Sequence, residues 1–90
     1  MMKRLFKIII SHEIEFDLEL DDAVLGAVNE EWRKSFYNLT TDDEIASHIS
    51  LNMCRYRLTL SDLDGFADQP NSNAIIIDRH DDYDITAEAV

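Results

Sequence analysis

The chain has 90 residues, 19 of them acidic and eight basic, which gives a formal net charge of −11 at pH 7. Such a charge repels phosphate and excludes direct binding to nucleic acid or to an anionic membrane unless a separate basic patch exists. Because 46% of the residues are hydrophobic, a wholly disordered acidic tail is also excluded. The length predicts one domain covering residues 1–90.

The first ten residues combine basic side chains with an apolar run, as a secretory signal does. Lys7 interrupts this run, which ends at Ser11, and no small-residue cleavage site follows. The run is also well short of the ~20 residues of a membrane span. The one cysteine, Cys54, excludes an intramolecular disulfide and a cysteine-rich zinc site. We therefore expect a cytoplasmic protein.

Alternate positions are apolar from Phe6 to Leu20, with His12 as the exception. This period of two predicts strand character. The segment from Arg4 to Leu20 exceeds an ordinary strand of about 5–6 residues. It therefore forms either one long bent strand or a hairpin that turns near Ser11 and His12.

A first helix is expected near residues 22–38, with Asp21 or Asp22 as its N-cap. Apolar residues recur there at helical spacing, namely Val24, Val28, Trp32 and Phe36. Their stripe is expected to face the core, whereas Tyr37 points elsewhere and is expected to be exposed.

A second helix is expected near residues 42–57, where Thr41 and Glu44 match a capping box. Its apolar stripe is Ile45, Ile49, Met53 and Tyr56, and Arg55 and Arg57 are placed in its last turn.

The C-terminal third begins with a loop at 68–73, followed by a predicted buried strand at 74–77. Alternation returns from Asp82 onward. Together these patterns predict an α+β fold, in which 4–20 and 74–89 form a small antiparallel sheet covered by two helices.

The negative charge is concentrated in two segments. Residues 11–31 contain eight acidic and no basic side chains, and residues 58–90 contain eight acidic side chains and one arginine. The acidic residues alternate with apolar ones, so that in a strand they project from one face about 6.6–6.8 Å apart. If the two segments pair, one face carries up to seven carboxylates: Glu13, Glu15, Asp17, Glu19, Asp82, Asp84 and Glu88.

Two interpretations of these carboxylates are open. Acidic side chains on a half-exposed strand act as solubilising groups. Alternatively, a regular acidic array fits a Lys/Arg-lined nucleic-acid site of another protein, excludes the nucleic acid, and is steered there by long-range attraction. We favour the second interpretation because a charge of −11 exceeds the ~2–8 usual for a small domain.

In its size, its single-domain α+β pattern and its acidic strands, the whole chain resembles a known class of proteins. The segment Glu13-Ile14-Glu15-Phe16-Asp17-Leu18-Glu19 is typical of these strands. That class is the small acidic inhibitors of phages and mobile elements, comprising anti-CRISPR proteins and DNA-mimicking anti-restriction proteins. They share no sequence motif, so no residue role carries over. The resemblance implies a non-catalytic inhibitor of a host nucleic-acid-binding defence complex, acting in the host cytoplasm if phage-encoded.

Some basic residues depart from a uniform DNA mimic, namely Lys3, Arg4, Lys7, Arg33, Lys34, Arg55 and Arg57. An alternative is therefore a small interaction or assembly module, a homodimer among the options, that binds through its helices. Tyrosine and arginine are frequent binding anchors, and the candidates are Tyr37, Tyr56, Arg55 and Arg57.

Catalytic and metal chemistry find little support in the sequence. His12 and His80 occupy similar places after isoleucine runs and could approach each other across the sheet, but exposed imidazoles beside acids are the simpler interpretation and the one we favour. Cys54 lies inside a predicted helix rather than at an activating N-terminus. Gly26 and Gly65 are isolated, so no phosphate loop exists. We expect no catalytic residue, no cofactor and no metal.

Overall fold

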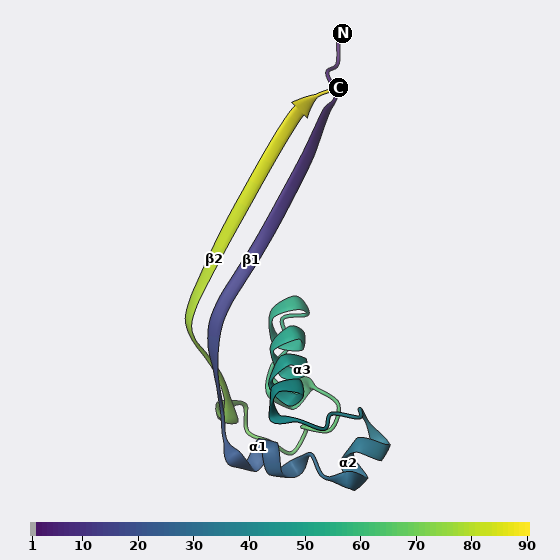
Figure 1. Cartoon of the computed structure of the whole chain (residues 1–90), viewed down its shortest axis with the longest axis vertical. Helices are drawn as coiled ribbons and strands as arrows, with labels where there is room; N and C mark the ends of the chain where they lie inside the picture. Colours follow the sequence, from purple (N-terminus) through teal and green to yellow (C-terminus); the bar gives the residue numbers. More distant parts are fainter. Residues whose placement is uncertain (1) are drawn as a thin grey trace. The chain divides into compact units, whose positions relative to one another are not determined.

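A computed structural model describes residues 2–90. The chain is α+β, and its small antiparallel sheet is built from the N- and C-terminal segments, as the sequence predicts (Figure 1). The elements in chain order are β1 (Phe6–Leu20), α1 (Asp22–Ala27), α2 (Glu30–Ser35), α3 (Asp42–Arg55), 3₁₀ turns at Leu60–Asp62 and Asn71–Asn73, and β2 (Ala74–Ala89). None of the helices within residues 2–90 is both long and apolar enough to cross a membrane.

The chain groups into two compact units. The first, which we call the ribbon, contains the N-terminal segment up to Asp17 together with Asp78–Val90. The second, the helical unit, is Leu18–Ile77 and contains all the helices.

The helical unit holds the hydrophobic core. Its buried residues are Val24, Val28, Trp32, Ile45, Ile49, Leu60, Leu63, Phe66 and Ala74, and Leu18 and Leu20 at the end of β1 pack against them. The predicted core positions in the two helical stripes are therefore confirmed for Val24, Val28, Trp32, Ile45 and Ile49, whereas Met53 is only partly buried and the last member of each stripe is exposed. Phe36 and Tyr56 are 45% and 57% exposed, because each lies just past the end of its helix.

The prediction of one helix over 22–38 is wrong, since two short helices occupy this segment. Val28 leaves helical geometry, with φ −83° and ψ 74°, and ends α1. Asn29 then caps α2, because its side-chain oxygen accepts a hydrogen bond of 2.9 Å from the amide of Trp32. The 3.6-residue apolar period continues across this break, and for this reason the sequence pattern does not reveal it.

The second predicted helix is α3, and its capping differs in detail from the expectation. Thr41 accepts the amide of Glu44 at 3.1 Å, as predicted. The carboxylate of Glu44 instead accepts from the amide and hydroxyl of Thr40, one residue earlier. The helix ends at Arg55, and Arg57 has a positive φ of 53°, so the placement of Arg57 in the last turn is wrong.

A close approach between Trp32 and Gly65 fixes the loop after α3 against the core. The indole Nε1 donates a hydrogen bond of 3.0 Å to the carbonyl of Gly65. Gly65 has φ 89°, and a Cβ at this position would lie 2.3 Å from the same nitrogen. Both the backbone conformation and the available space therefore require glycine.

Each terminal segment forms one continuous strand. Of the two alternatives for residues 4–20, the long strand is correct and the hairpin is wrong. The prediction of a buried strand at 74–77 holds only for Ala74, because Ile75 and Ile77 are 42% and 40% exposed. The predicted loop at 68–73 contains the second 3₁₀ turn.

The strand register changes once along the sheet. Asp21 donates its amide to the carbonyl of Asn73, whereas Val90 donates to Leu5, so β2 has one residue more than β1 between these two pairs. Asp78 has φ 52°, a left-handed conformation typical of the extra residue in a β-bulge. Because of this extra residue, the odd positions of β1 share a face with the even positions of β2 throughout the ribbon.

Candidate functional site

The ribbon has two chemically different faces. The His12 and Tyr83 rings stack with centroids 4.1 Å apart, which places these residues opposite each other and agrees with the Leu5–Val90 pair. In this register one face, the acidic face, presents residues 7, 9, 11, 13, 15 and 17 of β1 and the even positions 80–88 of β2, beyond the bulge at Asp78. The other, the apolar face, presents the even positions of β1 and the odd positions of β2.

Five of the seven predicted site residues come together on the acidic face. Glu13 lies opposite Asp82, Asp84 lies opposite Ser11, and Glu15 and Asp17 continue the row along β1. All five are exposed. Within the described chain none of them takes part in a salt bridge, so their charges are available to a partner.

The remaining two predicted residues, Glu88 and Glu19, lie outside this group. Glu88 lies on the acidic face but toward the end of the ribbon, opposite the cationic Lys7 in the register. Glu19 is exposed on the same strand but belongs to the helical unit. The acidic face therefore groups five of the predicted carboxylates rather than all seven in one row.

The charge density of this group resembles that of a nucleic-acid strand. The stretch from Ser11 to Asp17 is about 20 Å long at a rise of about 3.3–3.4 Å per residue. Five carboxylates over this length correspond to one charge per about 4 Å, close to the 3.4 Å spacing along one strand of duplex DNA.

The acidic cluster does not stabilise the ribbon. Glu13 and Asp82 are like charges directly across the strand pair, where Cβ atoms lie about 4.5–5.5 Å apart and such pairs are unfavourable. Solvent and salt weaken this repulsion, but they do not turn it into an attraction that would stabilise the strand pair. The arrangement is thus tolerated by the fold rather than required by it.

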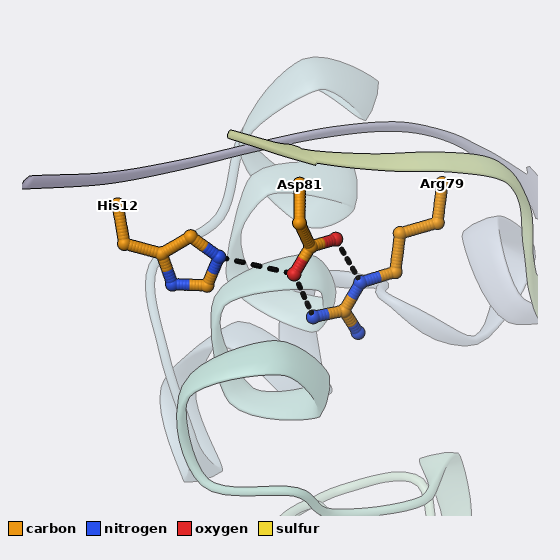
Figure 2. A network of polar contacts seen from close by, with 3 residues as sticks. All are labelled: His12, Arg79 and Asp81. Carbon is orange, nitrogen blue, oxygen red and sulfur yellow. Dashed lines mark hydrogen bonds and ion pairs between the residues drawn. The ribbon is translucent and has the colours of Figure 1, made fainter. Parts of the chain in front are cut away.

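The apolar face also carries a polar network, formed by the side chains of His12, Arg79 and Asp81 (Figure 2). The Arg79 guanidinium donates two hydrogen bonds to the Asp81 carboxylate, at 2.7 and 3.0 Å. His12 Nε2 lies 3.0 Å from the same carboxylate. The hydrogen bonds from Arg79, aided by His12, lower the pKa of Asp81 to about 2, against the opposing effect of desolvation.

Sequence reasoning missed this network, although both histidines are exposed as expected. His12 and His80 do not approach each other, because the register puts them on opposite faces of the ribbon. The period of two correctly assigns His12 to the same face of β1 as Ile8 and Ile10. Which residue of β2 lies opposite His12 depends on the strand register, and the bulge at Asp78 determines that register. No group of three or more His, Cys, Asp or Glu side chains suited to a metal ion occurs among residues 2–90.

The helical candidates are dispersed. Tyr37 is 42% exposed, as predicted, and its ring lies 4.5 Å from that of His48. The Arg55 guanidinium lies over the ring of Tyr56 at 5.6 Å.

Cys54 is a free, partly buried thiol within α3. In His48, burial lowers the pKa more than the nearby Asp64 raises it.

Comparisons with protein-family models, with curated proteins and with solved structures gave no match to the chain.

Proposed function

We propose that this chain is a non-catalytic inhibitor whose acidic face occupies a Lys/Arg-rich nucleic-acid site on a host defence complex, in the manner of anti-CRISPR or DNA-mimic proteins. The observation that carries the proposal is the group formed by Glu13, Glu15, Asp17, Asp82 and Asp84, which is exposed on one face of the ribbon and makes no salt bridge to any residue of 2–90. The proposal includes action in the cytoplasm and no direct contact with nucleic acid or membrane.

Two features favour binding over solubilisation alone. A solubilising charge works anywhere on a surface, whereas these carboxylates lie at regular spacing on one face and at nearly the linear density of a DNA strand. In addition, Glu13 and Asp82 face each other at a cost to the ribbon. A basic partner would offset that cost, because its Lys and Arg side chains neutralise both carboxylates at once.

The test uses the tagged protein as bait for host proteins, with short duplex DNA as the competitor. We expect wild type to retain basic nucleic-acid-binding proteins that duplex DNA displaces. The double variant Glu15→Lys with Asp17→Lys is expected to bind them at least about tenfold more weakly. Both positions are exposed, so the fold should survive, which circular dichroism checks.

The matched control is Asp64→Lys with Asp68→Lys, which makes the same change in net charge within the helical unit. It should retain the partner nearly as well as wild type. If both double variants lose binding equally, only bulk charge matters and the acidic face is not the site. If binding survives Glu15→Lys with Asp17→Lys, or resists competing DNA, the mimicry proposal fails.

A further inference from the structure

The apolar face of the ribbon is exposed over most of its length. Its large side chains are 52–62% exposed: Phe6, Ile8, Ile10, Tyr83 and Ile85. Each leaves on the order of 100 Å² open to solvent, so together they form an apolar patch of about 500–600 Å². This is at the upper end of the largest patches found on monomeric proteins, and patches of this size mark interaction sites.

The ribbon needs a partner for its own stability. A two-stranded antiparallel pair is at best marginally stable in water unless its apolar face packs against something. Among the described residues of the ribbon unit, only Ile14 and Phe16, next to the helical unit in sequence, are partly buried. The strands beyond them, from Phe6 to His12 and from Tyr83 to Ala89, are exposed.

This face is electrically neutral, unlike the opposite one. Its charged side chains are Arg79 and Asp81, which pair with each other at 2.7 Å, and His12 bonds to the same Asp81 carboxylate. A basic partner is therefore attracted to the acidic face, whereas the apolar face offers it no opposite charge. The apolar face instead suits an equally flat, apolar and neutral surface, which is what a second copy of the same face offers.

We propose that two copies of this chain dimerise by packing the apolar faces of their ribbons against each other. Two patches of this size bury about 1,000–1,200 Å², which reaches the ~1,000 Å² that a specific interface requires. The same face of each copy forms the contact, so the two copies are related by a two-fold axis and the assembly stops at a dimer. It forms a four-stranded, two-layer sandwich with the layers about 10 Å apart.

This arrangement is compatible with the high charge of each copy. Face-to-face packing turns the two acidic faces outward, on opposite sides of the sandwich, where they remain open to a partner. The dimer goes beyond the proposed function and does not depend on it, because the two activities use opposite faces of the ribbon. It also differs from a dimer formed through Tyr37 or Arg55 on the helices.

Adjacent isoleucines in β1 supply a matched test. Ile8 is 52% exposed on the apolar face and Ile9 is 53% exposed on the acidic face. Sedimentation velocity over a wide protein concentration range should show a wild-type dimer. Ile8→Glu should raise its dissociation constant at least about a hundredfold, because each copy then buries an unpaired carboxylate. Ile9→Glu, with the same charge change, should stay within about threefold of wild type.

Hydrogen exchange gives a second readout that needs no variant. Protection of the β1 and β2 amides in the ribbon is expected to rise with protein concentration, while protection in α3 stays constant. The fluorescence of Trp32, in the core of the helical unit, checks that both variants keep that unit folded.

A wild-type monomer at all concentrations overturns the proposal, as does a dimer that Ile8→Glu and Ile9→Glu affect equally. A dimer insensitive to Ile8→Glu also overturns it and indicates pairing through the strand edges or the helices instead. Failure of any of these tests leaves the acidic-face experiment with Glu15 and Asp17 unaffected, so the two proposals fail separately.

Discussion

The two glycines of the chain predict opposite responses to the same substitution. In Gly65→Ala, the new Cβ would lie 2.3 Å from Nε1 of Trp32 and 2.6 Å from its Cε2. The indole must therefore move, although it is packed with ring centroids 5.2 Å from both Phe36 and Phe66. Gly26, by contrast, lies within α1, and a Cβ added there would meet no atom within 4 Å.

The magnitudes follow from these contacts. Alanine at φ 89° costs about 1–2 kcal/mol, displacing the indole adds about 1–3 kcal/mol of overpacking strain, and losing its hydrogen bond to the Gly65 carbonyl adds about 1 kcal/mol. The loss of about 3–6 kcal/mol is a large part of the ~5–15 kcal/mol that stabilises a small domain. Gly26→Ala should instead gain up to about 0.5–1 kcal/mol, because glycine is unfavourable inside a helix.

Urea unfolding of the three proteins, followed by Trp32 fluorescence, measures both free-energy changes. A Gly65→Ala variant within about 0.5 kcal/mol of wild type, the range of an ordinary surface change, would refute the packing argument. So would a Gly26→Ala variant that is destabilised as strongly as Gly65→Ala.

Two further predictions concern the α2 cap and the ribbon network. Asn29→Ala should cost about 1 kcal/mol in urea unfolding because the amide of Trp32 loses its acceptor, while Asn29→Asp keeps it; equal losses in the two variants would contradict this role. Asp81 has its pKa lowered from 3.8 to about 2, so its contribution to stability is complete above pH 3.8 and is lost as the pH falls toward 2. An NMR titration should show this low pKa and its rise in Arg79→Gln, and an unchanged pKa would exclude Arg79 as the cause.

The sequence predicts the fold class and most of the helical core because hydrophobic periodicity determines which residues are buried. Val24, Trp32 and Ile49 are assigned to the core from spacing alone and are buried. Boundaries are less predictable, since the break at Val28 keeps the helical period. The side-chain cap that defines it, Asn29, carries no periodic signal.

The candidate site is predicted in part. Period-two alternation correctly places Glu13, Glu15 and Asp17 on one face, because side chains alternate in any strand. The partners of these residues across the ribbon depend on the register, which one extra residue near Asp78 shifts. Alternation also cannot tell an apolar face that meets the core, as at Leu18 and Leu20, from one that is exposed, as at Ile8.

The central claim is that the acidic face competes with nucleic acid for a basic protein surface. Fluorescence anisotropy of labelled duplex DNA bound to the captured partner, titrated with this protein, tests it most directly. We predict that wild type releases the DNA at about 0.1 M salt, where the Debye length is about 10 Å and the attraction between its carboxylates and the partner's Lys and Arg side chains is only partly screened. DNA that remains bound at saturating wild-type protein would contradict the claim.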